Sequence, residues 1–323
     1  MVLAGDIGGT NVRLALFEEH DKGFRQIVLE IFPGRDYSGL EEVLLAFLNK
    51  HGAAVTKACI GVAGVVRDGV VEMTNLHWRI DSREMARVAS LPTVSLLNDL
   101  VANAYGIAAM GPEDLETLHD GEEDPSGNRC MISAGTGLGE AGMVWNVTGH
   151  LPFHSEGGHV DFAPTNEEET DLYNYLKGRL KRVSYERMVS GPGMRNVYEF
   201  LRDTGRAEEP AWLADRLREK GTSMISATAL AGESELCSKA LHLFAILYGR
   251  AAGNLALTLM STGGVYLGGG IAPNILPKLR EESFREAFLA KGRLRPWLEK
   301  MPVRVILNDK AALLGAAWFA FHQ

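Results

Sequence analysis

Three glycine-rich segments are the part of this chain whose residue types are best suited to chemistry, because such segments can bind a phosphate. They are Asp6-Ile7-Gly8-Gly9-Thr10-Asn11, Gly135-Thr136-Gly137-Leu138-Gly139, and Gly263 to Ile271, which contains Gly268-Gly269-Gly270. Where no Cβ stands in the way, successive backbone N–H groups can converge on an anion. A tight turn without a ligand would explain any one of these segments alone about as well.

The first two glycine segments each join two strand-like runs. Residues 2–7 and 130–133 are short and apolar, and apolar residues resume after each turn at 12–16 and 141–145. In a P-loop or a Rossmann fingerprint the turn must open a helix instead, and no G-K-[ST] motif is present. The sequence therefore predicts one hairpin repeated along the chain, as a duplicated two-lobe fold requires.

A second candidate for chemistry is the pair Asn98-Asp99. Residues 94–97 read as a strand, and a helix is expected from Asn98-Asp99 to near Gly111. In α/β folds, ligands bind beside the carboxyl ends of strands, so Asp99 is a candidate acid or base. The competing interpretation is a helix N-cap, a position that aspartate suits well.

The elements expected around these residues alternate between strands and helices, which favours an α/β fold with a mixed sheet covered by helices. A capping box of Ser38 and Glu41 predicts a helix that Gly52 ends. The other predicted elements are strands at 24–32, 58–63 and 70–73, and helices at 83–89, 234–260 and 310–319.

Length and composition narrow the class of protein. A chain of 323 residues should form two lobes, and 46% apolar with 23% charged residues is ordinary for a globular protein. A net charge of −8 without a Lys/Arg-rich block argues against a nucleic-acid partner. Cys59, Cys130 and Cys237 have no metal-knuckle or disulfide spacing, which fits a reducing cytoplasm. No export signal and no uninterrupted apolar stretch of membrane-spanning length is expected.

Taken together, the three glycine segments resemble the phosphate-one, phosphate-two and adenosine segments of the hexokinase, Hsp70 and actin superfamily. Four further motifs follow in order and make the chain resemble the bacterial glucokinase family over nearly its whole length: Leu97-Asn98-Asp99, Glu156-Gly157-Gly158-His159, Ser184-Tyr185-Glu186-Arg187 and Ser190-Gly191-Pro192-Gly193. The resemblance implies an α/β fold of two ribonuclease-H-like (actin-like ATPase) lobes with an interlobe cleft. We expect a small lobe of residues 1–110 plus 305–323, closed by the C-terminal helix, and a large lobe of residues 111–304.

The resemblance also implies an activity, the ATP-dependent phosphorylation of glucose to glucose 6-phosphate, the first step of glycolysis. An alcohol that attacks ATP must lose its proton, and the resemblance makes Asp99 the catalytic base. It further implies that Asn98 and Glu156 bind the middle ring hydroxyls, and that His159 and Glu186 bind those nearer the anomeric carbon. Closure of the two lobes on the sugar would exclude water from the reaction.

ATP and Mg²⁺ are the cofactors that this resemblance implies. Asp6 would face Mg²⁺ through water, Thr10 would meet a phosphate oxygen, and Thr136 would reach toward the terminal phosphates. The other expected nucleotide-binding residues are Gly8, Gly9, Asn11, Gly135, Gly137, Gly268, Gly269 and Gly270. Because neither turn holds a lysine, Mg²⁺ and backbone dipoles would carry most of the charge compensation. Glucose and ATP are the expected partners of a cytoplasmic homodimer, with no nucleic acid and no membrane.

Several alternatives stay open from the sequence. The chain could be a kinase for another hexose or an amino sugar, since the glycine turns do not contact the acceptor. It could also be a non-catalytic sugar or ATP sensor, or an actin-like assembly protein. The direction of Glu140, next to the second turn, is not fixed by the sequence, and Glu167, Glu168 and Glu169 are expected to form a solvated helix start. The cysteine-rich zinc cluster of the repressor-related sugar kinases is absent from the sequence, so structural zinc is not expected.

Overall fold

A computed structural model of the protein describes residues 1–21, 23–51, 54–73 and 75–323. The chain divides into two compact units. The first unit comprises Met1–Glu113 and Asn308–Gln323, and the second comprises Asp114–Leu307. The sequence-based boundaries at residues 110 and 304 lie a few residues before these divisions.

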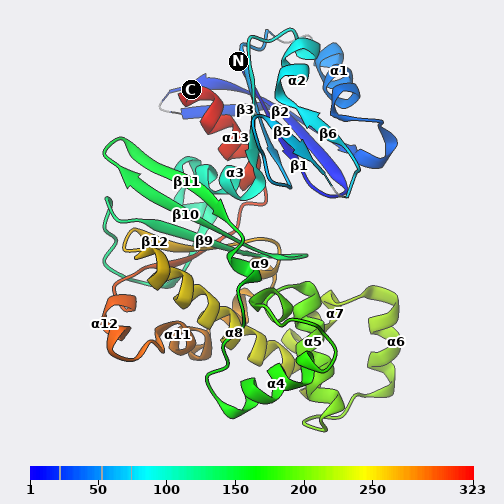
Figure 1. The fold of residues 1–323 in the computed structure, drawn as a ribbon, viewed down its shortest axis with the longest axis vertical. Coiled ribbons are helices and arrows are strands. Elements are labelled where there is room, and N and C mark those ends of the chain that lie inside the picture. Colours follow the sequence, from blue (N-terminus) through cyan, green and yellow to red (C-terminus); the bar gives the residue numbers. More distant parts are fainter. Residues whose placement is uncertain (22, 52–53, 74) are drawn as a thin grey trace. The chain divides into compact units, whose positions relative to one another are not determined.

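The first unit, which holds β1 to β3 (Figure 1), is built on a five-stranded sheet. Its strand order is β3-β2-β1-β4-β7. Its strands are β1 (Val2–Ile7), β2 (Asn11–His20), β3 (Gly23–Pro33), β4 (Lys57–Val62) and β7 (Val94–Asn98). The hairpin strands β1, β2 and β3 pair antiparallel, whereas β1, β4 and β7 pair parallel. Strands β5 (Val70–Glu72) and β6 (Arg79–Asp81) form a separate ribbon.

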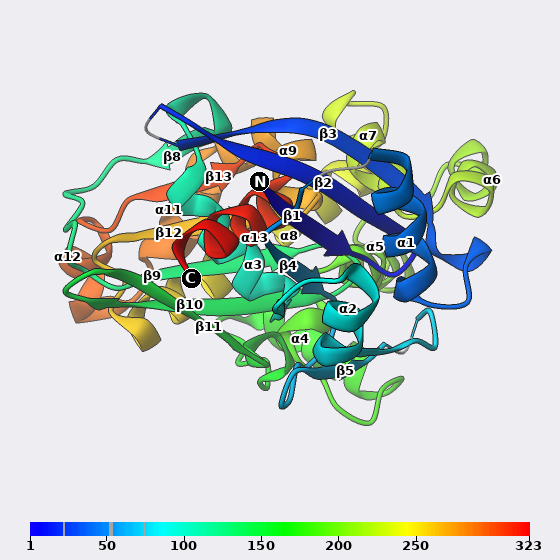
Figure 2. The same ribbon diagram turned by 90° about the horizontal axis from the view of Figure 1, so that it is seen from above.

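Helices cover both faces of this sheet because successive side chains of its strands point to opposite faces, and both faces are apolar. Leu3 and Ile7 pack with the buried side chains of α1 (Leu40–His51) and α2 (Ser82–Ala89). Val2 and Ala4 point to the other face and pack with α13 (Ala311–His322). Helix α13 runs beside α3 (Asp99–Gly106), as Figure 2 shows. A Cβ on Gly315 would overlap the Ala102 carbonyl, so glycine permits this close approach.

The second unit repeats the same strand pattern. Its sheet has the order β11-β10-β9-β12-β13-β8, in which β9 pairs antiparallel with β10 and parallel with β12. The strands are β8 (Leu115–His119), β9 (Arg129–Ala134), β10 (Leu138–Asn146), β11 (Gly149–Ser155), β12 (Gly264–Gly268) and β13 (Val303–Ile306). Three antiparallel strands followed by parallel ones occur in both units, which confirms the predicted duplicated fold.

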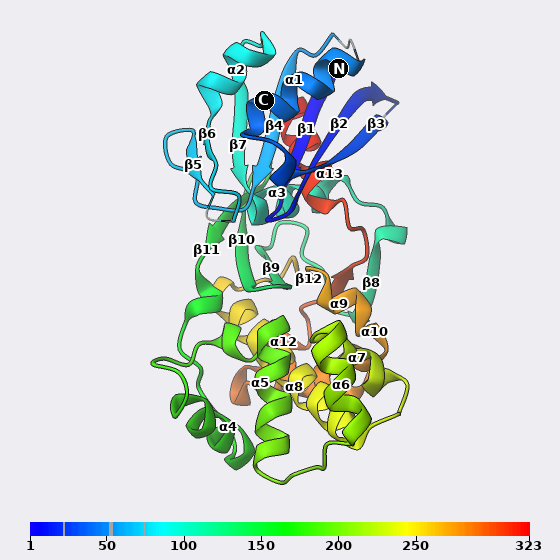
Figure 3. The ribbon, with the colours of Figure 1, turned by 90° about the vertical axis from the view of Figure 1, so that its right-hand side faces the viewer.

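Most helices of the second unit pack around α8 (Glu235–Leu259) (Figure 3). The others are α4 (Glu167–Lys177), α5 (Gly191–Asp203), α6 (Ala211–Lys220), α7 (Ser223–Leu230), α9 (Ile271–Asn274), α10 (Leu276–Leu279), α11 (Glu282–Leu289) and α12 (Arg295–Leu298). Helix α8 is long and apolar enough, by length and composition, to cross a membrane. Lys239 and Arg250 lie within it, so it is not the uninterrupted apolar stretch that the sequence analysis expected to be absent. Since 72% of its apolar window is buried within the protein, α8 is a core helix.

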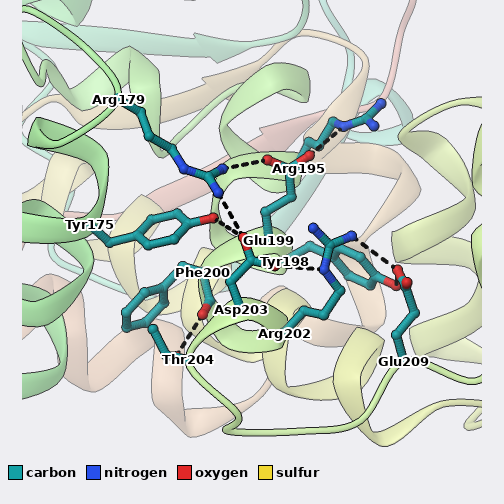
Figure 4. A network of polar contacts seen from close by, with 10 residues as sticks. All are labelled: Tyr175, Arg179, Arg195, Tyr198, Glu199, Phe200, Arg202, Asp203, Thr204 and Glu209. Atoms are coloured by element: carbon teal, nitrogen blue, oxygen red, sulfur yellow. Dashed lines mark hydrogen bonds and ion pairs between the residues drawn. The ribbon is translucent and has the colours of Figure 1, made fainter.

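A network of polar contacts joins α5 to α4 and to the segment that follows α5 (Figure 4). Asp203 accepts hydrogen bonds from the Tyr175 hydroxyl at 2.6 Å and from Arg179 at 2.7 Å. Glu209 accepts from the Tyr198 hydroxyl at 2.6 Å. These contacts fix the C-terminal half of α5, the helix whose N-terminus lies at the second glycine turn.

Several local expectations differ from the structure. Ser38 bonds to Glu42 rather than to Glu41, since the helix begins at Leu40. The expected end of this helix at Gly52 lies outside the described residues. Helix α3 ends at Gly106 and continues only as a 3-10 turn, Ile107–Ala109. Glu169 is fully buried and pairs with Arg250 at 2.6 Å, so the expectation that it is solvated is wrong.

Candidate active site

In the first unit, the candidate residues gather at the carboxyl ends of the parallel strands. The register aligns Ile7 of β1, Val62 of β4 and Asn98 of β7. The first glycine turn follows β1, and Asp99 follows β7, so the sheet brings the turn, Asp6 and Asp99 to the same edge. The Gly8 N–H donates to the Asn11 carbonyl at 3.0 Å and closes the turn.

Asp99 is the first residue of α3, and the N-cap is its neighbour Asn98. The Asn98 Oδ1 accepts from the backbone N–H groups of Leu100 at 3.0 Å and Val101 at 3.4 Å. The alternative of Asp99 as the N-cap is therefore replaced by a cap at Asn98. Burial raises the pKa of Asp99 to about 6, with the Leu100 N–H opposing that shift and the nearby Asp6 adding to it. A carboxyl group with this pKa can exchange protons near neutral pH.

The side chain of Asn98 is fully engaged within the protein. Its Nδ2 donates to the Gly64 carbonyl at 3.0 Å and to the Asp99 Oδ1 at 3.0 Å. With two accepted bonds on Oδ1, these contacts use the bonding capacity of an amide group. In this structure Asn98 caps α3 and orients Asp99, and its contact with a sugar stays a prediction.

Asp6 lies opposite Arg13 in the β1–β2 hairpin. The Arg13 Nη1 is 3.8 Å from the Asp6 Oδ2, and Arg13 also donates to the Asp309 carbonyl at 2.8 Å. Burial raises the pKa of Asp6, with Arg13 opposing that shift. Arg13 is a basic group beside the first turn that the sequence reasoning missed. The strand pairing of the predicted hairpin would have found it, because the pair next to Ile7 and Val12 is Asp6 and Arg13.

In the second unit, a cluster forms from Glu156, His159 and Glu186. The His159 Nε2 lies 3.9 Å from the Glu156 Oε2, and its Nδ1 lies 3.8 Å from the Glu186 Oε1. The Glu156 and His159 side chains are mostly exposed, whereas that of Glu186 is largely buried. The Glu186 Oε2 accepts from the Leu138 N–H at 3.1 Å. The structure thus brings together three of the residues predicted to bind a sugar.

The second glycine turn lies at the N-terminus of α5. Gly135 N–H donates to the Gly137 carbonyl at 2.9 Å, and Gly191 N–H donates to the Gly135 carbonyl at 2.8 Å. Ser190 caps α5 by accepting from the Gly193 N–H. The partial positive charge of a helix N-terminus therefore adds to the N–H groups of this turn, and both favour an anion.

A cavity of about 300 Å³ lies beside this turn within the second unit. It is lined by Gly135 and Thr136 of the turn, by Ile271 at the end of the third glycine segment and Asn274 just after it, and by residues of α5 and α7. Strand β12 runs parallel to β9, which sets Gly268 opposite Ser133 and brings the second and third segments together. The sequence reasoning missed Ser223 and Ser226 of α7, which also line the cavity. No sequence motif marks these two serines. Their place at the cavity depends on the packing of α7 against α8, which lies far along the chain from the second turn.

Comparisons with known proteins match nearly the whole length of this chain. A sequence model of the family described as Glucokinase matches residues 3–323. A glucokinase of Nostoc sp. (strain PCC 7120 / SAG 25.82 / UTEX 2576) is 40% identical over 335 residues, which cover 98% of each chain. The crystal structure of a glucokinase from an Antarctic psychrotroph superposes with a TM-score of 0.89 at 30% identity, covering 100% of this chain and 99% of the other. A Balamuthia mandrillaris glucokinase solved in complex with glucose gives a TM-score of 0.79 at 25% identity, covering 99% and 93%.

Proposed function

Because the chain belongs to the glucokinase family and phosphorylates glucose with ATP, we propose that Asp99 is the general base of this reaction. Three observations support the proposal. Asp99 lies at the carboxyl edge of the first unit's sheet, its pKa is raised to about 6, and Asn98 and the Leu100 N–H hold its Oδ1. A base with this pKa is mostly ionised at neutral pH and still accepts a proton readily.

The proposed step is an in-line transfer. Ionised Asp99 takes the proton of the 6-hydroxyl of glucose as that oxygen attacks the γ-phosphorus of ATP. The bond from the γ-phosphorus to the bridging oxygen breaks, and ADP leaves with the electron pair. The products are glucose 6-phosphate, ADP and the proton carried by Asp99.

The remaining candidate residues are proposed as binding groups. Glu156, His159 and Glu186 offer several hydrogen-bonding atoms for ring hydroxyls, and their clustering supports that role. The N–H groups of the second turn and of the α5 N-terminus would bind phosphate, together with Thr136. Thr10 and the first turn would do the same in the first unit. Gly268 to Gly270 of the third segment would border the adenosine, since the next residue, Ile271, lines the cavity beside the second turn.

Asp6 is the residue that fits a magnesium ion. Its carboxylate keeps about a fifth of its surface exposed, and oxygen donors suit Mg²⁺. The ion would neutralise charge on the phosphates when it is bound. We further propose that the protein is a cytoplasmic homodimer. Light scattering coupled to size-exclusion chromatography tests its oligomeric state.

The test of the base is a comparison of Asp99→Ala with the wild type in a coupled assay of glucose, ATP and Mg²⁺. We expect kcat to fall by about 10²–10⁴ while calorimetry still detects glucose binding. Asp81→Ala is the matched control, because Asp81 caps α2 by accepting from the Arg83 N–H at 3.0 Å. That control should lose about 1 kcal/mol of stability and keep its turnover. Near-normal turnover of Asp99→Ala would reject the assignment.

A further inference from the structure

Glu140 has no part in the reaction described above, yet its side chain packs against the segment that carries Glu156 and His159. Strand β10 sets Glu140 opposite Ser155 of β11, and only 8% of the residue is exposed. A Cβ on Gly157 would overlap the Glu140 carboxyl group. The carboxyl group therefore rests directly on the Gly157 backbone, and only glycine allows this contact.

The surroundings of the Glu140 carboxyl group are mostly apolar. It lines a cavity of about 220 Å³ together with Phe153, Val160, Leu255 and Leu259. Among the residues that the structure describes, its carboxyl oxygens have no hydrogen-bond or ion-pair partner, and burial alone raises the pKa of Glu140 to about 7. An unpaired carboxylate is costly in such a place, so burial favours the neutral acid, which is the main form below about pH 7.

The first residues of β10 contact both segments that carry the sugar-binding cluster of Glu156, His159 and Glu186. Leu138 N–H donates to Glu186, and a Cβ on Gly158 would overlap the Leu138 carbonyl. Two residues on, Glu140 contacts Gly157. The Gly157–His159 turn therefore lies on β10 through backbone at Leu138 and through a side chain at Glu140.

We propose that Glu140 is a positioning residue, which as a neutral carboxylic acid supports Gly157 and thereby fixes Glu156 and His159 for the sugar. This inference rests on the sugar-binding role proposed above. Ionisation would place an unpaired charge in the apolar cavity, and hydration of that charge would displace the side chain and the turn that it supports. The KM for glucose should therefore rise as the pH rises through about 7.

Other titratable groups around Glu140 do not account for such a change. The pKa values of the Cys130 thiol on β9 and of the Tyr185 hydroxyl are both raised by burial, with the charge of Glu140 adding to each shift. Both groups are therefore neutral from pH 6 to 9. Glu156, His159 and Glu186 also lie on the segments packed against Glu140. They are the same in wild type and in a Glu140 variant, so a comparison of the two proteins isolates Glu140.

The test is to measure the KM for glucose and kcat from pH 6 to 8.5 in the wild type, Glu140→Gln and Glu140→Met. Glutamine keeps the shape without the charge, and methionine fills the same space without a polar group. At pH 8.5 roughly 3% of a group with a pKa of about 7 is protonated, so we expect the wild-type KM to rise roughly fivefold to thirtyfold. In both variants the KM for glucose should change by less than about twofold between pH 6 and pH 8.5. The kcat of each variant should keep the pH dependence of the wild-type kcat. Glu208→Gln, on an exposed side chain, should behave as the wild type.

A second readout does not depend on activity. Because the pKa of Glu140 is raised in the folded protein, its contribution to stability is present at low pH and is lost as the pH rises from about 4.5 to about 7. Glu140→Gln should therefore have a higher Tm than the wild type at pH 8.5, and the difference should shrink at pH 5.

Two results would overturn the proposal: the same pH dependence of KM in the wild type and both variants, or a Tm difference that does not change with pH. Failure of the underlying sugar-binding role is a different result. In that case Glu156→Ala would bind glucose with normal affinity, while the Tm comparison would still report the neutral state of Glu140.

Discussion

The Glu186 carboxylate lies against Gly137 and accepts a hydrogen bond from the Leu138 N–H at 3.1 Å. A Cβ on Gly137 would stand only 2.7 Å from the Glu186 Oε2. Gly137 belongs to the second glycine turn, whereas Glu186 belongs to the sugar-binding cluster. A residue proposed to bind the sugar is therefore held in place by a turn proposed to bind phosphate.

A methyl group on this turn should accordingly weaken sugar binding. In Gly137→Ala the added Cβ would push Glu186 away and break its bond to the Leu138 N–H. A hydrogen bond to a charged group contributes about 1.5–3 kcal/mol, so we expect the KM for glucose to rise roughly tenfold to a hundredfold. Gly135→Ala is the matched comparison, because its Cβ would meet no atom within 4 Å. An unchanged KM for glucose in Gly137→Ala would show that the position of Glu186 does not govern sugar binding.

The raised pKa of Asp99 predicts how the rate depends on pH. A general base works in its ionised form, so kcat should fall about tenfold per pH unit below a pKa of about 6. The sign is opposite for stability, since a raised pKa stabilises the folded state at low pH and this contribution is lost as the pH rises through about 6. Asp99→Asn should therefore be more stable than the wild type at pH 8 by about 1–3 kcal/mol, with no difference below about pH 4. Profiles of kcat against pH check the predicted rate dependence, and chemical denaturation checks the predicted stability difference. A kcat that stays flat down to pH 5 would contradict the rate prediction.

Asn98 offers a test of positioning against direct sugar contact. In Asn98→Ser the hydroxyl can still cap α3, but the donor to the Asp99 Oδ1 is lost. That hydrogen bond lowers the pKa of Asp99, so its loss should move the acid limb of the kcat profile to higher pH. The KM for glucose should change by less than about threefold if Asn98 acts only through Asp99. A large rise in KM with an unmoved pH profile would favour direct contact with the sugar.

The buried pair of Glu169 and Arg250 predicts a large effect on stability. Glu169 is fully buried, bonds to Thr165 and Asn166, and lies 2.6 Å from the Arg250 Nε. Its replacement leaves a largely buried arginine side chain, 15% exposed, without its partner, so Glu169→Ala should lose about 3–5 kcal/mol in the free energy of unfolding. The neighbouring Glu168 is exposed, and Glu168→Ala should stay within about 0.5 kcal/mol of the wild type. Equal losses in the two variants would contradict the structural account of the pair.

The elements that the sequence predicted are those defined by neighbours along the chain. A short apolar run predicted β1, alternating apolar residues predicted β2, and the glycine turns between strands predicted both hairpins. These features depend on side-chain direction and on local backbone freedom, which a short window of sequence contains. Strand β8 was missed because three of its five residues are polar and it lies at the edge of its sheet, where most of its side chains are only partly buried.

The sequence by itself determined the fold class, the two hairpins and the residue types of the candidate site. The tertiary structure alone decided which carboxylates are buried, since Glu140 and Glu169 are indistinguishable along the chain from solvated neighbours. It also decided that Glu186 rests on Gly137 and that α7 lines the cavity at the second turn. The reason is physical: burial, and with it the pKa of a carboxyl group, is set by the packing of segments far apart in sequence, whereas turns and strands are set by residues next to one another.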